Sequence, residues 1–180
     1  EDYETLQNYC NEITRLAQTG RYADFIDDDY RTFYADYPAV VPLLVKAGIV
    51  KEKNGELVVD YIYNEGDVIP AHTGVILKGN CRGNAYVMEE GTTNATAPEG
   101  NLLHGTIEDE ETYVDGCDRY YMLSYDKATD MRLGFYWNGE NGPRPFVNKA
   151  YKAFLALPAS LNAMQMENFS LAEMENGGIS

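Results

Sequence analysis

The sequence has 180 residues and a formal charge of −15, from 29 acidic and 14 basic side chains. This length fits one domain that can bury a large core without a metal ion or a disulfide. The negative charge excludes nucleic acid and anionic membranes as favoured partners, and the longest apolar runs, such as AVVPLLV, are too short to cross a bilayer. No stretch has the composition of a signal peptide. The start at Glu1 fits both a matured export product and a fragment.

Residues 1–29 are predicted to form a helical segment. Apolar side chains recur there at three- and four-residue steps and make one stripe, formed by Leu6, Tyr9, Cys10, Ile13, Leu16 and Ala17. Gly20 stands where a left-handed C-cap is expected. We expect the stripe to pack on the rest of the protein, with Cys10 as a buried thiol, and residues 27–29 to form an acidic linker.

Residues 30–180 are predicted to form an all-β domain, because short apolar runs alternate with turn residues. Asn54-Gly55 is a strong hairpin signal, since both residues accept positive φ, and residues 127–130 have the polarity of a second hairpin loop. The expected strands lie in YRTFYADY, VKAGIVKEKNGELVVDYIY, TGVILKG, NAYVME, RYYMLSYD, MRLGFYW, NKAYKAFLAL and ENFSLAEME. The predicted fold is an antiparallel β-sandwich of jelly-roll type with the helical segment as an appendage.

The stretch GDVIPAHTGVILKGN, residues 66–80, is predicted to be a corner between two strands. Pro70 lacks an N–H and ends the incoming ladder, and Thr73 is expected to hold the turn by a local hydrogen bond. The glycines precede a strand and not a helix, which argues against a phosphate-binding loop. His72 is therefore interpreted as structural or solvent-facing, with catalysis as the less favoured alternative.

The order of the motifs IPAHTGVILKG, NLLHG, LGFY and NKAY resembles the β-sandwich domain that is repeated in secreted and surface-attached proteins of gut Bacteroidetes. The resemblance spans roughly residues 30–180 and is strongest over residues 68–79. It implies export, a sandwich fold and a place within a longer modular protein, and it brings no catalytic residues. His72 departs from the family, which often has a small polar residue such as Asn there, and PRPF at residues 143–146 replaces its usual IPA.

Catalytic, metal and cofactor sites have weak support in the sequence. Cys81 with His72 or His104 would make a thiolate–imidazole nucleophile, but a small side chain beside a turn is the favoured interpretation of Cys81. A disulfide between Cys81 and Cys117 is possible, but the spacing of the cysteines does not decide whether it forms. The acidic runs at residues 27–29 and 108–111 lack the alternating pattern of a calcium loop, and nothing singles out a carboxylate pair. No catalytic residue, metal site or cofactor is predicted.

The stretch GFYWNGENGPRPF, residues 134–146, is the best candidate for a ligand site. A sugar ring can stack its C–H face on an indole while its hydroxyls bind amides, carboxylates and guanidinium groups. The candidate binding residues are Tyr136, Trp137, Asn138, Glu140, Asn141 and Arg144. The alternative is that Trp137 covers the sheet core, because strand alternation puts only one of Tyr136 and Trp137 on the core face.

These patterns favour a non-catalytic module of a secreted or cell-surface protein that binds a glycan or another protein domain, for example in adhesion. The alternative is an exported hydrolase acting on polysaccharide or peptide. A hydrolase should show a cleft where two carboxylates, or a thiol and an imidazole, converge. A binding module should show an exposed aromatic with polar side chains around it. A purely structural module should show neither feature.

Overall fold

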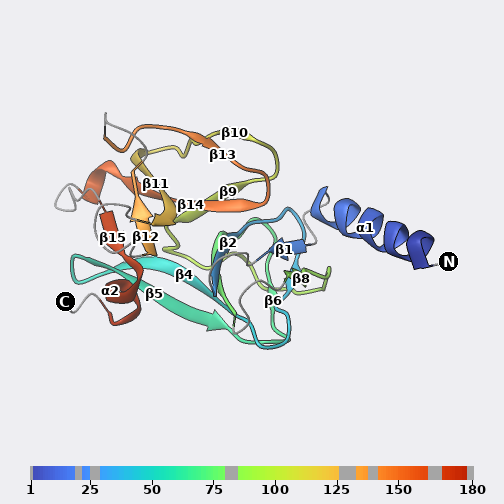
Figure 1. The fold of residues 1–180 in the computed structure, drawn as a ribbon. Helices are drawn as coiled ribbons and strands as arrows, with labels where there is room; N and C mark the ends of the chain where they lie inside the picture. The colour runs from blue at the N-terminus through green and yellow to red at the C-terminus, as the bar shows by residue number, and fades with distance from the viewer. Residues whose placement is uncertain are drawn as a thin grey trace.

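The computed structural model describes residues 2–18, 22–24, 29–79, 85–125, 133–137, 142–161 and 168–177. Its body is built from two antiparallel sheets that face each other (Figure 1). One has the order β2-β7-β4-β5, from β2 (Tyr30–Phe33), β7 (Val75–Lys78), β4 (Lys46–Lys53) and β5 (Glu56–Tyr63). The other has the order β15-β12-β11-β14-β9, from β15 (Asn168–Ser170), β12 (Leu133–Tyr136), β11 (Cys117–Tyr125), β14 (Lys152–Pro158) and β9 (Leu103–Thr106). The predicted all-β antiparallel sandwich is confirmed.

Three short two-stranded ribbons and three helical elements complete the described part of the chain. The ribbons pair β1 (Tyr22–Asp24) with β8 (Ala85–Val87), β3 (Ala39–Val40) with β6 (Val68–Ile69), and β10 (Glu110–Glu111) with β13 (Val147–Asn148). The helical elements are α1 (Asp2–Gln18), the 3₁₀ turn η1 (Ala159–Leu161) and α2 (Leu171–Glu175). Strands of two or three residues are too short for a periodic sequence signal.

The main core lies between the two sheets and follows from strand alternation. Ile76 of β7 points inward and meets inward side chains of the other sheet, such as Tyr121 and Phe135. Leu171 and Met174 of α2 join the same cluster. The buried members of this inter-sheet core are Val50, Leu57, Ile76, Leu103, Tyr121, Phe135, Leu155, Leu157, Phe169, Leu171 and Met174.

Each sheet also buries apolar side chains on its outer face. Val75 and Leu77 flank Ile76 on β7 but join a second cluster with Ile69 of β6. On the other sheet, Phe154 lies in a third cluster with Phe146, which precedes β13. These outer clusters explain the ribbons, since apolar residues on a second sheet face need a cover.

Helix α1 confirms the predicted helix but not its packing. Figure 1 shows α1 extending away from the sheets, and it meets the body at β1. Leu6 is 61% exposed and Cys10 is also exposed, so the predicted burial of the stripe is wrong at these two residues, because the helix axis points away from the core. Gly20 and most of the acidic linker lie outside the described residues. In the described part of the chain, we find no helix with the length and apolar character that crossing a bilayer requires.

The predicted turns are confirmed at both places that the structure describes. Asn54 and Gly55 have φ values of 54° and 84°, as a tight hairpin between β4 and β5 requires. At the corner, β6 ends at Ile69 before Pro70, and His72 has a φ of 61°, in the left-handed region. The third turn prediction, a loop at residues 127–130, lies outside the described residues.

The bond predicted to hold the corner is wrong. Thr73 is buried, but its hydroxyl has no hydrogen-bond partner among the described residues. Instead, the His72 N–H donates to the Ala35 carbonyl at 2.8 Å, and the His72 Nδ1 lies 3.1 Å from the Tyr34 hydroxyl. His72 therefore ties the corner to the chain that follows β2, which agrees with a structural role.

Two predicted strands are interrupted. The strand expected in NKAYKAFLAL is broken by a turn over residues 149–152, where Tyr151 has a φ of 60° and the Lys152 N–H donates to the Lys149 carbonyl at 3.2 Å. The strand expected in ENFSLAEME ends at Ser170 and continues as α2. A helix forms there because Leu171 and Met174, three residues apart, can bury one helical face on the inter-sheet core.

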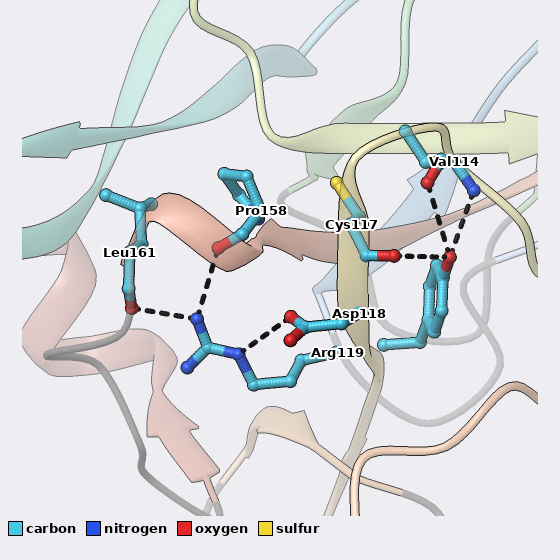
Figure 2. A network of polar contacts seen from close by, with 7 residues as sticks. Val114, Cys117, Asp118, Arg119, Pro158 and Leu161 are labelled. Atoms are coloured by element: carbon cyan, nitrogen blue, oxygen red, sulfur yellow. Dashed lines mark hydrogen bonds and ion pairs between the residues drawn. The ribbon is translucent and has the colours of Figure 1, made fainter.

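The first half of β11 is held by polar contacts with the end of β14, with η1 and with the turn that leads into β11 (Figure 2). Buried Arg119 donates from Nη2 to the carbonyls of Pro158 at 3.3 Å and Leu161 at 2.8 Å, and from Nε to Asp118 at 3.4 Å. The Tyr120 hydroxyl accepts from the Val114 N–H at 3.1 Å and donates to the Cys117 carbonyl at 3.2 Å. At this end of β11 these polar groups have their partners within the protein, and we call it the closed end.

Candidate functional site

The five-stranded sheet splits where the pairing of β11 with β14 stops. Their register runs from Cys117↔Pro158 to Tyr121↔Leu155. Beyond that pair, the rest of β11 pairs with β12 and the start of β14 pairs with β9. The sheet therefore forms a fork, with residues 122–125 on one prong and residues 152–154 on the other.

A pocket of about 480 Å³ lies in this fork, and we call it the fork pocket. Both prongs line it, and so do the edge strand β2 of the other sheet and β13 with the residues beside it. The described lining residues are 30–32, 122–125, 133, 146–149 and 152–153.

The fork pocket is lined by basic and aromatic residues in an otherwise acidic protein. Three cationic residues, Arg31, Lys149 and Lys152, contribute to the lining, together with Tyr30 and Tyr125. Among the described lining residues there is no Asp, Glu, His or Cys. The chain as a whole has twice as many acidic as basic side chains, so this local composition favours an anionic ligand.

Asn148 holds the turn that carries the two lysines. This side chain is buried, and its amide nitrogen lies 2.9 Å from Thr106 Oγ1 and 2.9 Å from the Lys152 carbonyl. The same nitrogen lies 3.2 Å from the Lys149 carbonyl. Because one amide binds both ends of the turn, it fixes the backbone that carries the Lys149 and Lys152 side chains.

Asp109 fixes the same turn from outside. Its Oδ1 accepts the Ala150 N–H at 2.9 Å and its Oδ2 lies 3.3 Å from the Lys149 ammonium. The Ala150 N–H and the Lys149 ammonium lower the pKa of Asp109. With Tyr151 held at a positive φ, the turn has one defined conformation, which reduces the entropy lost when a ligand binds.

Tyr30 connects the fork pocket to a second polar cluster under α2. The Glu175 carboxylate accepts hydrogen bonds from Tyr30 at 3.0 Å, Tyr61 at 2.7 Å and Lys78 at 2.9 Å. Burial raises the pKa of Glu175, but these hydrogen bonds outweigh burial and lower it. Burial and the bond to Glu175 raise the pKa of Tyr61. This Glu175 cluster attaches α2 to the four-stranded sheet.

The predicted ligand residues of GFYWNGENGPRPF are not gathered into one surface by the described residues. Trp137 is half-buried, packs on the inter-sheet core and stacks on Tyr121 with ring centroids 6.4 Å apart. Tyr136 is half-buried and pairs with Met122, which lines the fork pocket. Arg144 is exposed two residues before Phe146, another lining residue. Asn138, Glu140 and Asn141 lie outside the described residues.

The thiol–imidazole pair considered in the sequence stays a prediction that the described residues do not test. Cys81 lies outside the described residues, and Cys117 is a free thiol whose pKa is raised by burial and by neighbouring Asp118. His104 is half-buried beside Phe154, and burial lowers its pKa. Within the described part of the chain, no group of three His, Cys, Asp or Glu side chains is placed to hold a metal ion.

The turn at residues 149–152, which we call the lysine turn, was not predicted, because NKAYKAFLAL has the apolar pattern of one continuous strand. A usable signal was present, since Lys149 and Lys152 lie close together in a chain that has only 14 basic residues. The fork itself had no such signal, because it depends on where two distant strands stop pairing.

No protein-family profile, curated protein or solved structure matches this chain.

Proposed function

We propose that this chain is a non-catalytic binding module of a secreted or cell-surface protein, and that its fork pocket binds a glycan carrying carboxylate or sulfate groups. One observation carries the proposal. Three cationic residues and two tyrosines line an open pocket of about 480 Å³ in a chain of net charge −15.

The lining suits each part of such a ligand. Lysine ammonium groups bind carboxylate or sulfate oxygens by charge-assisted hydrogen bonds. Tyrosine rings can cover the apolar face of a sugar, and Ser124 and Asn148 add polar atoms for the ring hydroxyls. The pocket volume falls in the range of small-ligand sites, which fits one or two sugar rings.

Binding is favoured over hydrolysis by the kind of residues in the pocket. Glycoside hydrolysis uses two carboxylates on opposite sides of the scissile bond, and the described lining contributes cations and tyrosines instead. The resemblance of residues 30–180 to surface-protein domains supports a location outside the cytoplasm.

The test is a titration with trigalacturonate, a trisaccharide of uronic acid, monitored by the fluorescence of the lone Trp137. This indole stacks on Tyr121, and Tyr121 precedes the lining residue Met122 in β11, so a ligand in the fork should change its emission. Calorimetry supplies an independent affinity. The methyl ester of the same trisaccharide is the matched ligand control, because it keeps the rings and loses the charges.

We expect saturable binding of the acid, at least about tenfold weaker binding of the ester, and a similar loss in the double variant Lys149→Gln/Lys152→Gln. Lys53→Gln, which changes an exposed lysine at the β4–β5 hairpin, is the matched control and should bind normally. Sulfated disaccharides serve as the second acidic probe. If none of the acidic sugars binds, or if the ester binds equally well, the proposed ligand class is wrong. Release of new reducing ends would favour the hydrolase alternative.

A further inference from the structure

A second surface, which shares no residue with the fork pocket, exposes apolar side chains at a turn. Leu43 and Leu44 occupy the turn between β3 and β4 and are 72% and 55% exposed. Val87 of β8 is 44% exposed. Single exposed apolar residues are ordinary on proteins, but here two neighbouring leucines and a valine gather exposed apolar surface in one place.

The backbone at this turn is strained at Leu44, one of the two exposed leucines. Leu44 has a φ of 64°, a conformation that costs free energy for residues with a Cβ atom and that glycine adopts readily. The turn is held there by the Leu44 N–H, which donates to Glu65 Oε2 at 2.9 Å, and by the Val45 N–H, which donates to the Pro42 carbonyl at 3.2 Å. Folding alone would be served better by glycine at this position.

Beside the turn lies a groove of about 450 Å³ whose lining combines apolar and acidic residues. Its apolar lining residues are Val40, Val41, Pro42, Leu43 and Val87, and Leu44 follows this lining in the chain. Its acidic lining residues are Glu65 and Glu89, both exposed, and the described lining has no Lys or Arg. An apolar side chain can be buried in this groove, while a cation beside it would meet two carboxylates.

We propose that this surface, which we call the Leu43 groove, docks a segment of another protein that presents an apolar side chain next to Lys or Arg. The argument rests on charge complementarity together with the exposed leucines and the strain at Leu44. A second copy of this chain is a poor occupant, since two chains of charge −15 repel each other and would bring two acidic linings together. Anionic lipid surfaces are repelled for the same reason.

The probe is a displayed library of random 12-residue peptides, selected on the full-length protein and counter-selected on the variant Leu44→Gly. Leu44→Gly removes the side chain and relieves the positive φ, so its melting temperature should be unchanged or higher while binding is lost. The strongest peptide is then synthesised, and its affinity is measured by calorimetry against the wild type, Leu43→Ser, Leu44→Gly and the pair Glu65→Gln/Glu89→Gln.

We expect selected peptides to combine Leu, Ile or Phe with Lys or Arg, to bind at least tenfold more weakly to Leu44→Gly, and to lose several-fold affinity with the two Gln substitutions. The matched control is Ile62→Ser, which removes an exposed apolar residue on β5 and should leave binding intact. The proposal fails if no peptide discriminates against Leu44→Gly, or if selected peptides are basic without apolar residues. Concentration-dependent dimerisation lost in Leu44→Gly, or binding to phosphatidylglycerol vesicles, would assign the surface to a second copy or to a membrane and overturn the proposal.

Discussion

The two halves of strand β11 differ in what surrounds them. In the first half, Arg119 and Tyr120 donate hydrogen bonds to backbone carbonyls of η1 and of β11 itself, and β11 is paired with β14. In the second half, β11 has parted from β14, and residues 122–125 line an open pocket. One strand therefore has a closed end, which is paired with β14 and tied by buried polar contacts, and an open end, which lines a pocket together with cationic residues of neighbouring elements.

This contrast separates stability from binding along a single element. At the closed end, buried donors and acceptors are satisfied internally, so removing one leaves another unpaired. At the open end, the lysines are exposed and their backbone positions are fixed by Asn148 and Asp109. Substitutions should therefore lower stability at the closed end and ligand affinity at the open end.

The largest loss of stability is expected from Arg119→Ala. The substitution removes a buried guanidinium that serves two carbonyls, those of Pro158 and Leu161, and pairs with Asp118. We expect the free energy of unfolding to fall by about 3 kcal/mol, measured by urea denaturation. Arg144→Ala, at an exposed arginine, is the control and should change it by less than about 0.5 kcal/mol. Equal effects of the two variants would contradict the closed end as a source of stability.

Tyr120→Phe should have a smaller effect at the same end. The ring stays in its cluster with Phe154 and Phe146, but the hydroxyl that bonds Val114 and Cys117 is lost. One hydrogen-bonding group with a buried partner is worth about 1–2 kcal/mol, and urea denaturation should show a loss of that size. Tyr113→Phe, at a tyrosine that is exposed, should leave the transition unchanged. If Tyr120→Phe left the free energy of unfolding unchanged, a water molecule would be replacing the hydroxyl as the partner of Val114 and Cys117.

The sandwich was predictable because its signals are local. Asn54-Gly55 fixes a hairpin by the conformations its own two residues accept. The continuous apolar run of Val75, Ile76 and Leu77 is likewise a local signal, typical of a strand buried on both faces, and the structure buries all three side chains. The short ribbons that cover the outer faces have too few residues for any such pattern.

The fork was not predictable, because it is set by where β11 and β14, whose paired residues lie more than thirty positions apart, lose their register. Tyr151 gives no sign in the sequence of its positive φ, which arises from bonds made by distant Asp109 and Thr106 to the lysine turn. The prediction for Trp137 depended on strand alternation, and the indole packs with Tyr121 on the core side. Its polar neighbours lie outside the described residues.

The Glu175 cluster is expected to make the stability of the folded protein depend on pH. Burial raises the pKa of Glu175, but the hydrogen bonds from Tyr61, Lys78 and Tyr30 lower it below its ordinary value of 4.5. A lowered carboxyl pKa stabilises the folded protein above the unfolded pKa, and this contribution is lost as the pH falls through the folded value. Glu175→Gln should therefore cost about 2 kcal/mol at pH 7.

The measurement is urea denaturation of the wild type and Glu175→Gln at pH 7 and pH 3. The difference between them should be smaller at pH 3, because below the ordinary pKa of 4.5 protonation favours the unfolded state, whose Glu175 has the higher pKa. Glu173→Gln, on the same helix at an exposed position, is the control and should show a small difference at both pH values. A constant difference for Glu175→Gln would mean that packing, and not the ionised carboxylate, attaches α2.

The smallest effect on stability is expected from Lys152→Gln, and it tests the comparison most directly. Lys152 is exposed at the start of β14, and its carbonyl, not its ammonium, receives the bond from Asn148. Glutamine keeps that carbonyl and a long side chain, so the free energy of unfolding should stay within about 0.5 kcal/mol of the wild type. Trigalacturonate affinity should nevertheless fall. If Lys152→Gln instead lowered the free energy of unfolding as much as Arg119→Ala, the Lys152 ammonium would be needed to stabilise the fold, and both ends of β11 would contribute to stability.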